Sequence, residues 1–110
     1  MLHFSYGETV DATAPRTWQV IRDFTAIARA GLAERVEMVG DGVGCCRHLY
    51  MPGGRVLVER LEARDETAFM LAYAMTESGP MPLKKYQASL QIIGEGHTCR
   101  AIFTAGQVRA

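Results

Sequence analysis

Apolar and polar residues alternate along most of the second half of the chain, which is the pattern of β-strands with one buried face. Short segments rich in glycine and proline, such as 40–44 and 52–54, separate these runs. The predicted strands cover residues 2–10, 35–39, 45–51, 56–63, 67–75, 83–93 and 98–105. Because tight turns join neighbouring strands, the pattern predicts an antiparallel sheet.

A helical period replaces the alternation after the first strand. Thr13 is suited to an N-cap, and Pro15 falls in the first turn, where its missing N–H is harmless. The expected apolar face of this helix consists of Trp18, Ile21 and Thr25, together with Val20 and Phe24. A second short helix is predicted over residues 25–30, ending at Gly31. The fold class predicted is therefore α+β, with both helices on one side of the sheet.

Composition narrows the class of protein. The chain has 110 residues, of which 48% are hydrophobic and 22% charged, and this balance is typical of one folded domain, here residues 1–110. Its twelve basic and twelve acidic residues cancel, so no positive field favours nucleic acid or an anionic membrane. The chain shows no membrane span and no signal-peptide pattern, so we expect a cytoplasmic protein.

Motifs for metal, cofactor or nucleophilic chemistry are absent from the sequence. The histidines do not pair with Cys, Asp or Glu at a metal-ligand spacing, and the three cysteines form no CxxC pair. The glycine-rich segment 40–44 leads into a strand rather than a helix, which indicates a hairpin turn instead of a phosphate loop. We therefore expect no metal and no cofactor, and no catalytic residue can be assigned.

Several segments resemble the START-like (SRPBCC) superfamily, in its polyketide cyclase/dehydrase branch. The resemblance is carried by residues 18–24, 40–47 and 58–65, with Tyr73 and Tyr86 where the family tends to place tyrosines. It implies a helix-grip fold, in which a seven-stranded antiparallel sheet curls around a long C-terminal helix. Two short helices are implied between the first and second strands. Members of the superfamily bind or transform lipids, polyketides and aromatic molecules in an apolar cavity.

The sequence departs from the family pattern in three places. Residues 30–32 read Ala-Gly-Leu where many members have Trp-x-Pro, and Ala12-Thr13 replaces the usual Ala-Pro. The chain also stops at Ala110, soon after the last predicted strand, so the long C-terminal helix is expected to be absent. The predicted fold is a helix-grip sheet with two short helices and no closing helix.

Alternation also predicts which residues line the concave face, provided that the register is as assigned. The more apolar set is placed there, and the ligand-binding residues predicted from it are Arg47, Leu49, Met51, Glu59, Leu71, Tyr73, Met75, Tyr86 and Phe103. Arg47 and Glu59 are either a polar anchor for a ligand, an acid–base pair, or a structural ion pair. The two tyrosines serve either ligand contact or packing.

An apolar concave face without a closing helix needs another cover. We expect a homodimer in which two open faces share a core, or a fragment whose covering segment is missing. Three functions remain open at this stage. The first is binding of a hydrophobic small molecule, the second is a polyketide cyclase/dehydratase-like enzyme, and the third is a structural dimerisation domain with a filled cavity.

Overall fold

The computed structural model of the chain describes residues 3–26, 31, 33–77 and 86–107. One α-helix follows the first strand in this part of the chain, and six further strands follow the helix. In chain order the elements are β1 (His3–Val10), α1 (Ala14–Ile21), β2 (Arg35–Val39), β3 (Cys46–Tyr50), β4 (Val56–Asp65), β5 (Met70–Glu77), β6 (Tyr86–Glu95) and β7 (Thr98–Gln107).

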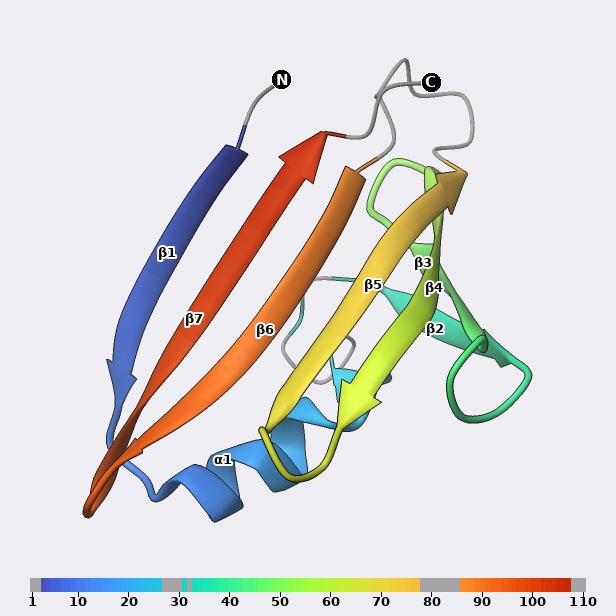
Figure 1. The fold of residues 1–110 in the computed structure, drawn as a ribbon. Coiled ribbons are helices and arrows are strands. Elements are labelled where there is room, and N and C mark those ends of the chain that lie inside the picture. The colour runs from blue at the N-terminus through green and yellow to red at the C-terminus, as the bar shows by residue number, and fades with distance from the viewer. Residues whose placement is uncertain (1–2, 27–30, 32, 78–85, 108–110) are drawn as a thin grey trace.

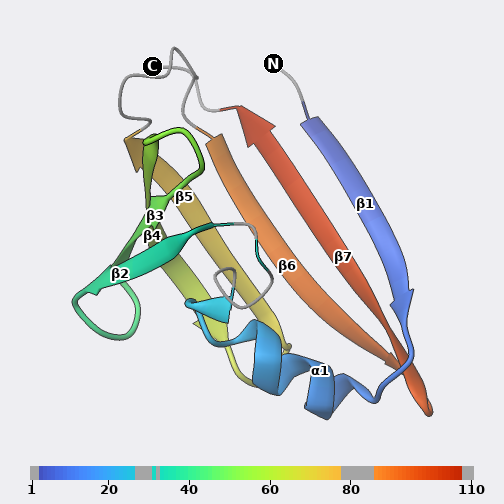
Figure 2. The same cartoon turned by 180° about the vertical axis from the view of Figure 1, so that it is seen from behind.

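The seven strands form a single antiparallel sheet in the order β1-β7-β6-β5-β4-β3-β2. The sheet is strongly curved, and α1 lies across one end of it, beside the β4–β5 and β6–β7 turns (Figures 1 and 2). This arrangement confirms the predicted α+β helix-grip fold. Residues 27–30 of the second predicted helix, 25–30, lie outside the described residues, and β7 is the last element that the structure describes.

The β6–β7 turn is tighter than the sequence predicted. β6 continues to Glu95 and β7 begins at Thr98, so only two residues remain in the turn. Gly96 adopts a φ of 77°, which a glycine reaches without a steric penalty and which a two-residue hairpin turn requires. The strand predicted over 83–93 therefore ended two residues too early, whereas the predicted start at Thr98 and the hairpin itself are confirmed.

Two irregularities in the β4–β5 ladder change which residues share a face. The partner of Leu61 is Tyr73, whereas that of Ala63 is Ala72, so β4 carries one extra residue between them. Such a bulge reverses the alternation beyond it. Arg64 consequently pairs with Leu71 and faces the concave side, which simple alternation does not predict.

The core lies between α1, the segment after it, and the concave face. Its buried members are Ala14, Trp18, Phe24, Cys45, Leu61, Leu71, Ile92 and Cys99. The sheet residues in this set confirm the predicted concave face. Val20 is a correction to the predicted helix face, because it is 55% exposed. Ala14 and Trp18, four residues apart, share the buried side of α1 instead.

Polar contacts hold α1 against the β4–β5 turn. The Trp18 Nε1–H donates to Glu66 Oε1 at 2.7 Å, and the Trp18 ring stacks on Phe69 with centroids 5.5 Å apart. Arg22 donates to the same carboxylate through Nε at 3.0 Å and Nη2 at 2.8 Å. Thr13 occupies the N-cap position as predicted, but its side chain makes no capping hydrogen bond. In the part of the chain described, no helix is long and apolar enough to cross a membrane.

Candidate functional site

A buried ion pair lies on the concave face where β3 and β4 meet. Arg47 and Glu59 are direct partners in the β3–β4 ladder, so their side chains stand on the same face. Arg47 donates to Glu59 Oε1 through Nε at 2.9 Å and Nη2 at 2.7 Å. Arg47 is 7% exposed and Glu59 is 2% exposed, so the pair is removed from water.

Three aromatic residues complete what we call the anchor cluster: Phe24, Arg47, Glu59, Tyr73 and Tyr86. The guanidinium lies 3.8 Å from the centroid of the Phe24 ring and 4.8 Å from that of Tyr73, and its Nη1 donates to the Phe24 carbonyl at 2.9 Å. The Tyr86 hydroxyl donates to Glu59 Oε2. Both Glu59 oxygens are therefore occupied, one by Arg47 and the other by Tyr86.

The environment of the anchor cluster keeps both tyrosines protonated. Burial raises the pKa of Tyr73 to about 12, with the Glu59 charge as a further cause. The pKa of Tyr86 is raised as well, first by burial and then by the charge of Glu59 and the hydrogen bond to it. Both hydroxyls are thus donors at neutral pH, and neither serves as a base.

The buried polar atoms of the cluster all have hydrogen-bond partners. Across the described residues, no buried side-chain nitrogen or oxygen lacks a hydrogen-bond partner. A buried charge is tolerable only when it is paired and hydrogen-bonded in this way. The cluster can therefore present a polar and aromatic surface, but the charges of Arg47 and Glu59 are already paired with each other.

The structure places the predicted ligand-binding residues in three different environments. Four of them, Arg47, Glu59, Tyr73 and Tyr86, meet in the anchor cluster. Fully buried core positions are occupied by Leu49, Leu71 and Met75. The remaining two, Met51 and Phe103, are half-buried, Met51 just after β3 and Phe103 within β7. Their role in ligand binding stays a prediction.

A row of residues crosses the concave face from its open edge toward the core. Tyr6 pairs with Phe103, Phe103 with Leu90, and Leu90 with Leu71, so the four side chains share one face. Tyr6, on the edge strand β1, is 58% exposed, whereas Leu71 is 2% exposed. We call these four residues the concave row. Sequence reasoning did not identify Tyr6, because only the β1–β7 register shows that it faces Phe103.

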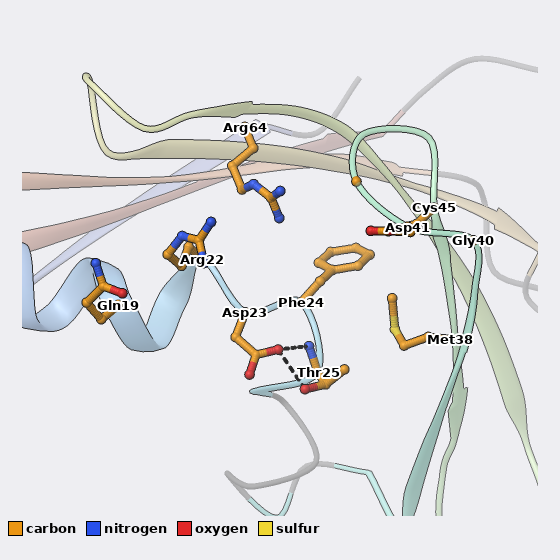
Figure 3. Close-up of a pocket in the computed structure, with 11 residues that line it drawn as sticks. Gln19, Arg22, Asp23, Phe24, Thr25, Met38, Gly40, Asp41, Cys45 and Arg64 are labelled. Carbon is orange, nitrogen blue, oxygen red and sulfur yellow. Dashed lines mark hydrogen bonds between the residues drawn. The ribbon is translucent and has the colours of Figure 1, made fainter.

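The structure also has an open cleft of about 470 Å³ near the buried end of the concave row, where Arg64 pairs with Leu71. It lies between the end of α1, the β2–β3 turn and β4, and Figure 3 shows Phe24 near its centre with Arg22 and Arg64 beside it. None of the nine predicted ligand-binding residues lines this cleft. In the described ranges, no three His, Cys, Asp or Glu residues come together as a metal site.

Solved structures of other proteins have the same fold. XoxI from Bacillus cereus is 20% identical and matches with a TM-score of 0.87 over 100% of this chain and 78% of its own. An aromatase/cyclase, ZhuI from Streptomyces sp. R1128, is 22% identical, with a TM-score of 0.81 over 99% of this chain and 69% of its own. Norcoclaurine synthase from Thalictrum flavum, solved with dopamine and hydroxybenzaldehyde, is 21% identical, with a TM-score of 0.77 over 94% and 67%.

A comparison with protein families agrees with these likenesses. No curated protein matches the chain. A family described as "Polyketide cyclase / dehydrase and lipid transport" matches residues 1–109. The predicted resemblance is thereby confirmed over nearly the whole length, and the chain belongs to this polyketide cyclase / dehydrase and lipid transport family.

Proposed function

We propose that the chain binds a hydrophobic small molecule, such as a lipid, a polyketide or an aromatic compound, on the open part of its concave face. The family description and the fold of the related structures support a ligand-binding or cyclase-type role in general. The observation that carries the proposal is the concave row, where Tyr6 is 58% exposed and Leu90 is half-buried on the inner face of a curved sheet. An apolar surface of this kind marks a binding site more often than a free surface.

Two alanines, Ala88 and Ala105, lie next to the concave row. Ala88 lies between Tyr86 and Leu90 on β6 and pairs with Ala105 on β7, so two short side chains stand side by side. Ala88 also pairs with Tyr73 on the other side. A flat apolar molecule resting on the two alanines would contact Leu90 along one edge and the anchor-cluster tyrosines along the other.

Binding is favoured over catalysis because the charged groups of the anchor cluster are already paired. Arg47 and Tyr86 occupy both oxygens of Glu59, and the raised pKa values of Tyr73 and Tyr86 keep these phenols neutral. General base catalysis needs a group that is free to accept a proton near neutral pH. The anchor cluster instead offers tyrosine rings and hydroxyls that orient a ligand.

Titration with the neutral fluorescent probe N-phenyl-1-naphthylamine tests this proposal. We expect saturable binding, weakened at least tenfold in Leu90→Gln, because the variant places an amide on the apolar floor. Gln91→Ala is the matched control, since Gln91 is the next residue on β6, is exposed and faces away. Equal binding by both variants, or no saturable binding to the parent protein, would contradict the proposal.

A cyclase-type reaction is the second candidate, and the Tyr86–Glu59 hydrogen bond favours it. A proton held between a phenol and a carboxylate at the edge of an apolar surface is an arrangement used in general acid catalysis. Under this alternative, Tyr86→Phe abolishes turnover of a polyketide-type substrate while probe binding survives. Retention of turnover in Tyr86→Phe would eliminate Tyr86 as the acid.

A second copy of the chain, as in the predicted homodimer, would compete with a ligand for the same face. If two copies cover each other through the concave row, sedimentation should show a dimer. The probe should then either separate the two copies or fail to bind while they are associated. A monomer that binds the probe with one-to-one stoichiometry would support ligand binding and contradict dimerisation through this face.

A further inference from the structure

Two arginines form a cationic wall on one side of the cleft beside α1, and both contact the same glutamate. Arg22 binds Glu66 through Nε and Nη2, and Arg64 approaches the same carboxylate through Nε at 3.2 Å. Figure 3 shows both guanidinium groups on the same side of the Phe24 ring. Because one carboxylate holds two arginines, this wall keeps an excess positive charge.

Both arginines retain hydrogen-bond donors for a ligand. Arg64 contacts Glu66 through Nε, and Arg22 donates to it through Nε and Nη2, so Glu66 engages only part of each guanidinium group. The shared Glu66 fixes the position of each guanidinium, so a ligand does not have to pay the full cost of ordering a long side chain. The wall is therefore preorganised for an acceptor group.

The rest of the cleft is apolar near its centre and carries the Asp23 carboxylate at its lower edge. Phe24, Met38 and Cys45 line it together with the glycines of the β2–β3 turn. Asp23 is turned toward Thr25, whose backbone N–H and Oγ1–H donate to Asp23 Oδ1 at 2.9 Å and 2.6 Å, as Figure 3 shows. The cleft thus combines an apolar centre with a cationic wall on one side and the carboxylates of Asp23 and Asp41 elsewhere in its lining.

We propose that this cleft is a second binding site, which takes a small molecule with a carboxylate on a planar apolar body. A guanidinium presents parallel N–H groups that match the two oxygens of a carboxylate. The apolar body would lie against Phe24 and Met38, and about 470 Å³ is within the usual range for small-molecule sites. Asp41 also lines the cleft, so a singly charged group suits it better than a doubly charged phosphate.

The cleft shares no residue with the concave row, although Arg64 pairs with Leu71 at the row's buried end, and the proposal does not depend on the function proposed above. Phe24 is the one residue common to the cleft and the anchor cluster. Its ring faces the Arg47 guanidinium, while its neighbours Asp23 and Thr25 line the cleft.

Amide NMR of the full chain, titrated with naphthalene-2-carboxylate, tests the proposal. We expect saturable shifts centred on Phe24, Thr25 and Gly42, and binding at least tenfold weaker for the isosteric naphthalene-2-carboxamide. Arg64→Gln should weaken carboxylate binding at least tenfold, and Arg64→Lys should have a smaller effect because it keeps the charge but loses the fork.

Arg60→Gln is the matched control for Arg64→Gln. Arg60 lies on the same strand, is ion-paired with Glu62 at 2.9 Å and does not line the cleft, so its loss should leave carboxylate binding unchanged. The dispersion of the amide spectrum reports whether each variant is folded. The proposal would be overturned if the acid and the amide bound with equal affinity, or if Arg64→Gln and Arg60→Gln had equal effects. It would also be overturned by shifts centred on Tyr73 and Leu90, or by no shifts at millimolar ligand. The neutral-probe titration of the concave row is unaffected by any of these results.

Discussion

At the scale of single residues, the Arg47–Glu59 pair is the most constrained feature of the molecule. Sequence alternation placed both residues on the concave face, and the β3–β4 turn made them direct partners. The Tyr86 hydroxyl and the Phe24 carbonyl complete the pair's hydrogen bonds from 27 and 23 residues away in the chain. No local pattern encodes contacts at such separations, so the sequence predicted the pair but not the groups that complete its hydrogen bonds.

Removing one charge of this pair should lower the free energy of unfolding far more than removing one charge of a surface pair. Glu59→Gln leaves the Arg47 guanidinium buried without a counter-charge, and we expect the free energy of unfolding to fall by about 3–5 kcal/mol. Glu62→Gln breaks the exposed pair with Arg60 on the same strand and should cost less than about 1 kcal/mol. Urea unfolding of both variants measures the two free energies of unfolding. Equal losses would show that the buried charge contributes no more to stability than the exposed one.

The double variant Arg47→Met/Glu59→Met separates charge from packing. Both charges are removed together, so no uncompensated charge stays in the core, although the Tyr86 hydroxyl loses its acceptor. We expect the double variant to be more stable than Glu59→Gln alone. A double variant less stable than the single one would mean that the ion pair itself contributes net stability.

At the scale of secondary-structure elements, the turn residues explain why the strands could be predicted. Glycines in the β2–β3, β3–β4 and β6–β7 turns have positive φ values and mark where the chain reverses. The bulge in β4 could not be predicted, because it is defined by the pairing with β5 and no glycine marks it. This bulge turns Arg64 to the concave side, so the cleft was absent from the sequence-based prediction.

The contact between α1 and the β4–β5 turn is sensitive to acid through Glu66. Hydrogen bonds from Arg22 and Trp18 lower the pKa of Glu66 from 4.5 to about 2. A carboxyl group with a lowered pKa in the folded state adds stability that is present above its ordinary pKa and is lost as the pH falls toward the folded value. The contribution of Glu66 is therefore expected to disappear between pH 4.5 and about 2.

Glu66→Gln tests this acid sensitivity. We expect the variant to melt at a lower temperature than the parent protein at pH 6, and the difference between the two melting temperatures to shrink as the pH is lowered through this window. Circular dichroism melts at a series of pH values give the measurement. A difference that stays constant from pH 6 to pH 2 would show that the Glu66 carboxylate does not stabilise the α1 contact through its charge.

At the scale of the whole molecule, a curved sheet is covered by α1 at one end and carries an exposed aromatic residue farther along its concave face. The sequence predicted the sheet and its concave residues, since alternation and turn spacing determine these features. Which residues stay accessible depends on where α1 packs. Leu71 therefore proved to be core, whereas Tyr6, which had not been identified, proved to be exposed.

The location of a bound hydrophobic molecule tests the central claim most directly. Intermolecular nuclear Overhauser effects should connect bound N-phenyl-1-naphthylamine to the Leu90 methyl groups and the Phe103 ring on the concave face. Val56 and Val58, which pair with residues of β3 on the opposite face, should give none. Contacts to Val56 and Val58 in place of Leu90 and Phe103 would contradict the assignment of the concave face as the binding surface.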